Sequence, residues 1–497
     1  MDSSLFNDYV TGSTFYDEMY NGKAIRPPYG KLYEHLSKFT AEELTQKEEM
    51  ARRLFMSQGV TFTVYSGDEG IEKIFPFDIV PRIITSTEWS YIESGIKQRL
   101  KALNLFLNDI YSNQFIIKDK IIPIEMIYSC EHYLREMHNL KVPHEIFVHI
   151  SGIDIIRDSD GTFYVLEDNL RTPSGVSYML ENREITKRIF PDLLPSTSVR
   201  PVTNYPQLLY KNLAALSPRH NSNPNIVMLT PGIYNSAYFE HSTLARLMGI
   251  ELVEGRDLVV DNHRVFMKTT QGLQRVDVIY RRVDDEYLDP LVFNADSMLG
   301  VAGLMSAYRK GHVAIVNAPG NGVADDKAVY IYVPDMIKYY LNEEPILKNV
   351  PTYKLEDNAE REHVFKNIEK MVIKKTNGSG GYGMIIGNAA TEKEIEEYKN
   401  FAFNKNFFEI ALAIIFTTTT QKFINSISET VIMPFINFLI QQTEGDWRKL
   451  IFNPTKGLEI EIGKFLASLI EFSITSLVLF VVYRMVTKKI KKDTKPL

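Results

Sequence analysis

The sequence has a single cysteine, Cys130, and only 2 tryptophans in 497 residues. One cysteine excludes an intrachain disulfide framework and a zinc site built from several cysteines. Lys and Arg total 56 against 62 Asp and Glu, so the chain lacks the basic excess typical of nucleic-acid binding, and no nucleic acid is expected. Because 44% of residues are hydrophobic and 24% are charged, a disordered or collagen-like chain is also excluded.

The N-terminus, MDSSLFNDYV, has neither a basic region nor an apolar core, so it is not expected to be a secretory signal. We therefore expect the N-terminal part to stay in the cytosol. At roughly 150 residues per domain, the length suggests about three domains.

The last hundred residues differ from the rest by two long apolar runs. Residues 407–440 hold three charges, and Phe465–Val482 holds one. Runs of this length predict membrane helices, although a buried core helix is the alternative for the first. We expect spans at 407–440 and 463–487, an external loop at 441–462 and a basic cytoplasmic tail at 488–497. Both chain ends then lie in the cytosol, as in a multi-pass protein of the inner (plasma) membrane.

Strand-like and helix-like segments alternate before residue 391, which predicts an α/β fold. A capping box at Thr40 predicts a helix that runs to Gly59. Apolar residues at core spacing, such as Leu103 and Leu107, predict a long helix from Thr85 to Asn113. Further helices are expected at 235–248 and 297–309. Strands are expected at 144–158, 162–168, 225–232, 276–283 and 312–319.

A hairpin with Asp160-Gly161 as a two-residue loop places Asp154 opposite Glu167. Asn169 then points to the same face, because side chains alternate along a strand. Carboxylate and amide oxygens are ligands that magnesium prefers. The alternative is a solvated hairpin face. Arg171 follows two residues later, and its guanidinium suits a phosphate or a carboxylate.

A glycine-rich segment follows the apolar strand that ends at Lys374. Glycines at 378, 380, 381 and 383 would let backbone N–H groups approach phosphate oxygens. The segment lacks the GK[ST] of a P-loop. Lys374 and Lys327 are placed to reach phosphates. A hairpin turn and two solvated lysines are the alternative interpretation.

From about residue 15 to 390 the sequence resembles circularly permuted ATP-grasp type 2 proteins, which are similar to glutathionylspermidine-synthase-like ligases. Segments that carry the resemblance include HISGIDIIRDSDGTFYVLEDNLRTPSGVSYMLENR, NAPGNGVADDKAVY and SGGYGMIIG. The resemblance implies binding of ATP and Mg, and joining of a carboxylate to an amine or peptide through an acyl-phosphate. It implies metal ligands at Asp154, Glu167 and Asn169, ATP-phosphate lysines at Lys327 and Lys374, and a nucleotide-covering loop at Gly380, Gly381 and Gly383.

Arg171, Arg281 and Glu240 are further candidates for contacting substrate, the two arginines as catalytic residues. Buried structural charges are the alternative for all three. The resemblance ends near Thr391, so a domain at 1–391 is expected that lacks the family's C-terminal part.

Residues from about 395 to 492 resemble the large-conductance mechanosensitive channel. The segment IEEYKNFAFNKN is similar to its amphipathic first helix, which predicts a junction helix at 392–406. Ile410 and Ile414 match the hydrophobic gate, which blocks ions by dewetting. Packing of helix against helix is the alternative for these isoleucines. The resemblance implies a lipid bilayer as partner and a homopentamer.

The sequence thus predicts a membrane-anchored, ATP-grasp-like carboxylate–amine ligase fused to a channel-like module. One alternative is a tension-gated channel whose cytosolic domain is a non-catalytic pseudoenzyme. Another is a fusion artefact of two separate genes.

Overall fold

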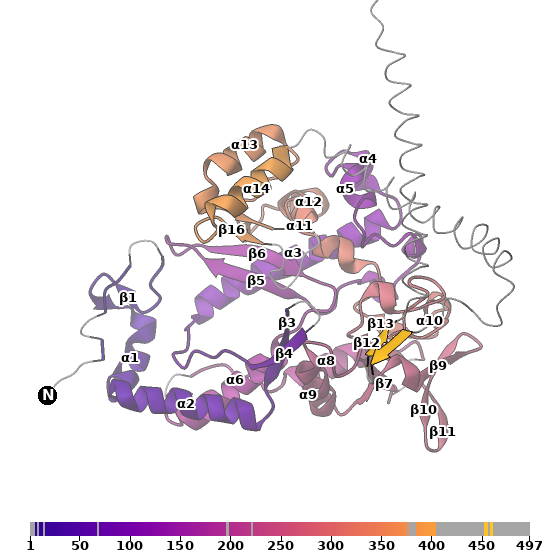
Figure 1. The fold of residues 1–497 in the computed structure, drawn as a ribbon, viewed down its shortest axis with the longest axis horizontal. Coiled ribbons are helices and arrows are strands. Elements are labelled where there is room, and N and C mark those ends of the chain that lie inside the picture. The colour runs from indigo at the N-terminus through magenta and orange to yellow at the C-terminus, as the bar shows by residue number, and fades with distance from the viewer. Residues whose placement is uncertain are drawn as a thin grey trace, which may run out of the picture. The chain divides into compact units, whose positions relative to one another are not determined.

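The computed structural model describes residues 5–6, 9–12, 15–66, 69–194, 198–219, 222–374, 376, 384–403, 452–455 and 458–460. They fall in two compact units. The first is Met1–Val364 with Val372–Ile385, and the second is Phe365–Met371 with Ile386–Leu497. The first unit is an α/β domain with several small sheets (Figure 1), as the alternation of strands and helices predicts.

The α-helices are α1 (Gly30–Leu36), α2 (Ala41–Ser57), α3 (Ser86–Ile110), α4 (Phe115–Lys118), α5 (Ile124–Tyr128), α6 (Val176–Ile189), α8 (Tyr205–Ala214), α9 (Tyr238–Met248), α10 (Leu304–Arg309), α11 (Lys327–Tyr330), α12 (Val333–Leu341), α13 (Asn358–Lys366) and α14 (Glu392–Phe403). The strands are β1 (Tyr20–Asn21), β2 (Ala24–Ile25), β3 (Thr61–Ser66), β4 (Glu69–Ile74), β5 (Gly152–Arg157), β6 (Phe163–Asn169), β7 (Ile226–Leu229), β8 (Glu251–Val253), β9 (Leu258–Asp261), β10 (Arg264–Thr269), β11 (Gly272–Arg275), β12 (Val278–Arg281), β13 (Ala314–Val316), β14 (Lys348–Asn349), β15 (Val372–Ile373), β16 (Ile385–Ile386), β17 (Phe452–Thr455) and β18 (Leu458–Ile460).

Two long helices begin at capping boxes, and the one at Thr40 was predicted. The Thr40 hydroxyl accepts from the Glu43 N–H, while the Glu43 carboxylate accepts from the Thr40 N–H. Thr85 and Glu88 repeat the arrangement at the start of α3. Each box satisfies two backbone donors that a helix start leaves unpaired.

A four-stranded parallel sheet, in the order β13-β12-β7-β8, forms the centre of one half of the domain. Strands β7, β12 and β13 are buried on both faces, whereas the edge strand β8 is partly exposed. On β7, Ile226 and Met228 pack against α8 and α9, whereas Val227 and Leu229 face the main core with α10. Full burial explains why this strand reads as a continuous apolar run in the sequence.

The β5–β6 hairpin has an unexpected loop but the expected pairing at its open end. Arg157 pairs with Phe163, so the loop is longer than two residues, and Gly161 adopts φ +88° within it. Farther along, β6 has one extra residue, Leu166, between the partners of Ile155 and Asp154. This β-bulge offsets the longer loop, and Asp154 lies opposite Glu167 as predicted.

The predicted strand at 144–158 begins only at Gly152, because asparagine side chains replace a neighbouring strand before it. The Asn104 side-chain oxygen accepts from the N–H groups of Phe147 and Val148. The Asn317 side-chain oxygen does the same for the two residues that follow. These bonds satisfy a buried, irregular backbone that sequence patterning reads as a strand.

A buried ion pair joins β6 to α3. Arg99 donates from Nε and Nη2 to the two carboxylate oxygens of Asp168, at 2.7 and 2.6 Å. Both side chains are 1% exposed, and Arg99 also donates to the Asn349 side chain at 2.7 Å. The pair therefore fixes which face of β6 is directed toward α3.

In the second unit, α14 spans much of the predicted junction helix, and β17 pairs with β18 inside the predicted external loop. None of the described helices is both long enough and apolar enough for a bilayer. The predicted spans at 407–440 and 463–487 lie outside the described residues.

Asp168→Ala should lower the stability of the first unit strongly, because it leaves the Arg99 cation buried without its partner. We expect a loss of about 3–5 kcal/mol, measured as the shift of the first unfolding transition in urea. Arg53→Met is the matched control: its ion pair with Glu49 is exposed, so the loss should stay below about 1 kcal/mol. Equal losses in both variants would contradict the role given to the buried pair.

Candidate functional site

The open end of the β5–β6 hairpin presents three oxygen-bearing side chains on one face. Asp154 pairs with Glu167, and Gly152 pairs with Asn169 two positions farther on. Gly152 is needed opposite Asn169, because an added Cβ would come within 3.1 Å of the Pro173 Cβ. Since Asp168 points to the opposite face, its buried pair with Arg99 directs Glu167 and Asn169 outward.

Two lysines from distant parts of the chain converge on one carboxylate oxygen. Lys327 Nζ lies 3.4 Å from Glu167 Oε2, and Lys374 Nζ lies 3.5 Å from the same atom. Lys327 is the first residue of α11, whose N-terminus is capped by the Asp326 side chain. The Lys327 N–H also donates to the Thr376 carbonyl at 3.1 Å, which ties the two lysine segments together.

The neighbouring charges shift the pKa values of Glu167 and Asp154 in opposite directions. Burial raises the pKa of Glu167, but Lys327 and Lys374 outweigh it, so the pKa lies below its ordinary value. Desolvation and the Glu167 carboxylate raise the pKa of Asp154. Glu167 is therefore held as an anion.

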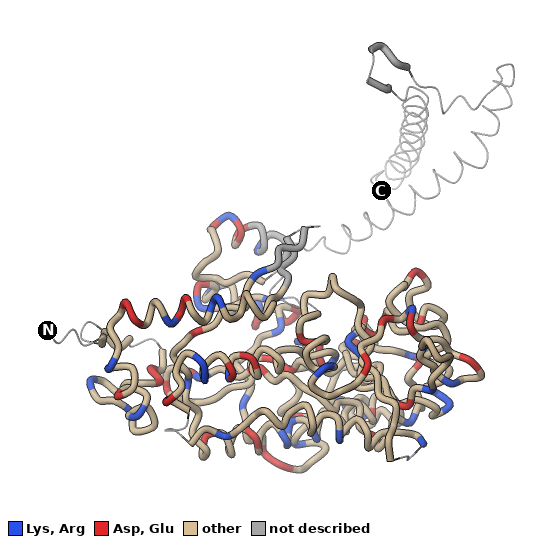
Figure 2. Tube along the Cα trace, turned by 90° about the horizontal axis from the view of Figure 1, so that it is seen from below, with Lys and Arg blue, Asp and Glu red and all other residues tan. Residues whose placement is uncertain are grey.

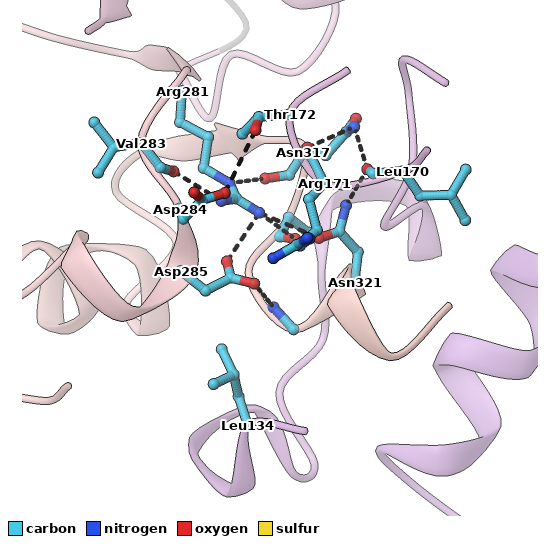
Figure 3. A network of polar contacts seen from close by, with 12 residues as sticks. Leu134, Leu170, Arg171, Thr172, Arg281, Val283, Asp284, Asp285, Asn317 and Asn321 are labelled. Atoms are coloured by element: carbon cyan, nitrogen blue, oxygen red, sulfur yellow. Dashed lines mark hydrogen bonds and ion pairs between the residues drawn. The ribbon is translucent and has the colours of Figure 1, made fainter. Parts of the chain in front are cut away.

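The segment that follows Asn169 is held by side chains from the loop before Lys327. The Asp325 carboxylate accepts from the N–H groups of Leu170 and Arg171, at 2.6 and 2.8 Å. Asn317 and Asn321 donate to the Leu170 carbonyl, at 2.8 and 2.6 Å (Figure 3). The metal-ligand candidates and Lys327 thus belong to one hydrogen-bonded assembly.

Arg171 lies beside this assembly, and its Nε is 3.6 Å from an Asp325 oxygen. Burial acts to lower its pKa, but Asp325 and the acidic residues 284–286 outweigh burial and raise it. Its side chain is 19% exposed. The guanidinium is therefore close to the surface and remains charged.

Arg281 is completely buried, and protein groups surround its guanidinium (Figure 3). It donates to the carbonyls of Asn317 and Val283, at 2.8 and 2.9 Å. It also contacts the Asp285 carboxylate at 2.8 Å. This geometry fits the structural alternative for Arg281.

Glu240 is also buried and bound to the backbone. Its carboxylate accepts from the N–H groups of Gly175 and Ser177, at 2.7 and 3.0 Å. Nearby, Arg282 donates to the carbonyls of Pro173 and Thr172, at 2.7 and 3.1 Å. Glu240 and Arg282 therefore shape the turn that leads from the hairpin into α6.

Gly380, Gly381 and Gly383 lie outside the described residues, as do Ile410 and Ile414. Among the described residues, no group of three or more His, Cys, Asp or Glu side chains is arranged to hold a metal. The candidate set of Asp154, Glu167 and Asn169 has only two carboxylates, and its third ligand is an amide, so it does not belong to that class of site.

Sequence reasoning missed the residues that hold the site in place. Arg99 lies four positions before Leu103 on α3, so both are on the buried face of this helix. A charged residue on that face was the signal that could have indicated a buried ion pair. Asp325 and the two asparagines lie in a segment with several Gly and Ala residues directly before Lys327. No local pattern indicates that they contact residues 170–171.

Fold and site together define an α/β protein with a centre in which carboxylates face lysines. The chain belongs to the circularly permuted ATP-grasp family, whose model matches residues 81–409. Residues 395–497 match a second family, the large-conductance mechanosensitive channel, MscL. Residues 395–409 lie in both matches.

Several bacterial proteins are similar to the ATP-grasp part. The uncharacterized protein sll0335 of Synechocystis sp. is 50% identical over 385 residues, which cover 77% of this chain and 80% of that protein. The uncharacterized protein Rv2411c of Mycobacterium tuberculosis is 48% identical over 395 residues, covering 79% and 71%. A Frankia casuarinae protein named "Putative glutamate--cysteine ligase 2-2" is 39% identical over 389 residues, covering 78% of this chain and 45% of that protein.

Among solved structures, the apo form of a glutathione synthetase like-effector, GSS30, from Globodera pallida matches with a TM-score of 0.46. The sequence identity is 14%, and the match covers 73% of this chain and 79% of that chain.

Replacing both lysines, in Lys327→Met/Lys374→Met, should raise the pKa of Glu167 above its ordinary 4.5, because burial then acts without opposition from the two cations. In the native protein, the ionised carboxylate stabilises the fold above about pH 4.5, and this contribution is lost as the pH falls through the lowered pKa. In the variant, the ionised carboxylate of Glu167 destabilises the fold, and this destabilisation is relieved as the pH falls through the raised pKa. The difference in thermal midpoint between the two proteins should therefore be larger at pH 7 than at pH 4. Lys338→Met, on the exposed side of α12, should show no such trend.

Proposed function

We propose that the first unit is an ATP- and Mg-dependent ligase domain that joins a carboxylate to an amine. The observation that carries the proposal is the convergence of Lys327 and Lys374 on Glu167, next to Asp154. A carboxylate that coordinates a metal and lysines that neutralise phosphates must lie close together in such a centre.

The side chains present fit magnesium. Mg²⁺ is usually held by one or two carboxylates, and the rest of its shell is water and substrate phosphate. Asp154, Glu167 and Asn169 supply two carboxylates and an amide oxygen on one face. When bound, Mg-ATP would supply the phosphoryl group that activates the acid substrate.

The chain's own residues then have distinct roles. Lys327 and Lys374 bind phosphate oxygens as cations, and Glu167 stays ionised to hold the metal. Arg171, near the surface beside the hairpin end, binds the carboxylate of the acid substrate. Asp325 positions Arg171 through its backbone N–H, whereas Arg281 supports the loop beneath. The glycines at 380, 381 and 383 cover the nucleotide.

The names of relatives support a ligase and leave its substrate open. The Frankia casuarinae protein and a second from Frankia alni, 39% identical over 376 residues, carry the name of a glutamate–cysteine ligase as a putative one. This chain spans 45% and 43% of their lengths. We propose the same reaction type, amide formation from an acid and an amine. A non-catalytic pseudoenzyme would bind nucleotide without forming the amide.

The lysine contacts predict coupled binding of metal and nucleotide. In the nucleotide-free protein, both ammonium groups compete with Mg²⁺ for Glu167, so the metal alone should bind weakly. Lys374→Ala should strengthen binding of Mg²⁺ alone and weaken Mg-ATP binding about tenfold or more, because one charge-assisted contact to phosphate is lost. Isothermal titration calorimetry with Mg²⁺, and with ATP at saturating Mg²⁺, measures both.

Glu167→Gln should weaken binding both of Mg²⁺ alone and of Mg-ATP, whereas Lys338→Met should change neither affinity. If Glu167→Gln and Lys374→Ala both bind Mg-ATP with native affinity, the proposed nucleotide centre is wrong.

The family match at 395–497 favours a second function, a tension-gated channel in the membrane. We propose that Ile410 and Ile414 face a common pore and that a homopentamer forms it. An apolar ring at this constriction would block ions until tension widens it. Both chain ends are then cytoplasmic, which places the ligase domain with cytosolic ATP.

Ile414→Asn should hydrate the constriction and lower the tension that opens the channel, as recorded in patches of liposomes containing the full chain. Leu477→Ile, within the second predicted span, should leave the threshold unchanged. Absence of any tension-gated current in the native protein would refute the channel proposal and favour two genes joined as one.

A further inference from the structure

A second cleft, of about 720 Å³, lies between the end of α2, the start of β3, and helices α6 and α9. Its volume is within the range of about 300–1,000 Å³ usual for small-molecule sites. None of the five side chains at the carboxylate–lysine centre lines this cleft. The cleft is therefore a separate feature of the same unit.

On one wall of the cleft, the side-chain amide of Gln58 bridges the acidic Glu181 and the basic Arg188. With its amide oriented to satisfy both neighbours, Gln58 donates to Glu181 Oε2 at 3.1 Å and accepts from Arg188 Nη1 at 2.8 Å. No ion pair joins Glu181 to a basic residue in the part of the chain that the structure describes. Gln58 thus orients both charged groups without neutralising either.

The remaining charges give the cleft a positive balance. Arg246, on α9, also lines the cleft and acts electrostatically on Glu181, whereas Glu184 is paired with Lys187 at 2.5 Å. The groups left to meet a ligand are one carboxylate, Glu181, and two guanidinium groups, Arg188 and Arg246. Figure 2 shows acidic and basic residues interspersed along the trace of the chain.

Apolar and hydroxyl groups complete the lining. Phe62 and Phe239 provide aromatic surface, and Ser242 provides a hydroxyl. Ile233 lies at the rim and is 62% exposed. Such a cleft suits a small ligand with a short aliphatic body and charged ends.

We propose that this cleft binds a small dipolar acid that carries one ammonium and two carboxylates, as an acidic amino acid does. The ammonium meets Glu181, and the carboxylates meet Arg188 and Arg246. The ligand's net charge of −1 then balances the +1 of these three groups. An inorganic phosphate lacks the ammonium and leaves Glu181 unpaired.

The test is calorimetric titration of the full chain, without nucleotide, with L-glutamate and three comparison compounds. L-glutamine has the same shape but lacks the second carboxylate, and glutarate lacks the ammonium. We expect saturable one-to-one binding of L-glutamate. L-glutamine and glutarate should each bind about tenfold more weakly or worse, and inorganic phosphate more weakly still.

Two variants assign the contacts. Arg246→Gln should remove the preference for L-glutamate over L-glutamine, and Glu181→Gln should remove the preference over glutarate. Arg183→Gln, a control on α6 whose side chain donates to the Arg200 carbonyl, should keep both preferences. Arg246 is an exposed residue, so its variant should fold even if Glu181→Gln does not.

Equal binding of the three organic compounds, or no binding of L-glutamate, would overturn the proposal. So would tighter binding of phosphate, or native preferences in Arg246→Gln. Because nucleotide is absent from these titrations, their failure is distinct from failure of the proposed ligase centre.

Discussion

The buried pair of Arg99 and Asp168 determines which way the candidate site faces. Strand side chains alternate, so anchoring Asp168 against α3 directs Glu167 and Asn169 to the opposite face. A slip of one residue would exchange the two faces and bury the site carboxylates in place of Asp168. The cost of breaking a buried, bidentate pair opposes such a slip.

A second constraint comes from the irregular backbone between Asn169 and α6, whose buried polar groups must all be hydrogen-bonded. Its buried N–H and C=O groups need partners, and charged side chains provide them. Asp325 and Glu240 accept from N–H groups, whereas Arg282 donates to carbonyls. This requirement explains why several ionisable residues near the site are buried. Arg281 and Glu240, which sequence reasoning considered either for substrate contact or as buried structural charges, both bind backbone groups.

Sequence reasoning succeeded where the physics is local and failed where it is not. The capping box at Thr40 and the α/β class followed from short patterns. The pairing of Asp154 with Glu167 was predicted from a two-residue loop that does not exist, and a bulge at Leu166 restored the register. The approach of Lys327 and Lys374 to Glu167 came from family resemblance alone, because residues so far apart leave no local signal.

The charges of the centre balance one another. Two carboxylates side by side repel each other, and the raised pKa of Asp154 reflects this repulsion together with burial. The two lysines balance the pair, so its net charge is zero when all four groups are ionised. A ligand that brings a cation and an anion together keeps this balance, whereas either ion alone disturbs it. In the proposed ligase reaction, these internal ion pairs would be exchanged for contacts with a metal-bound phosphate.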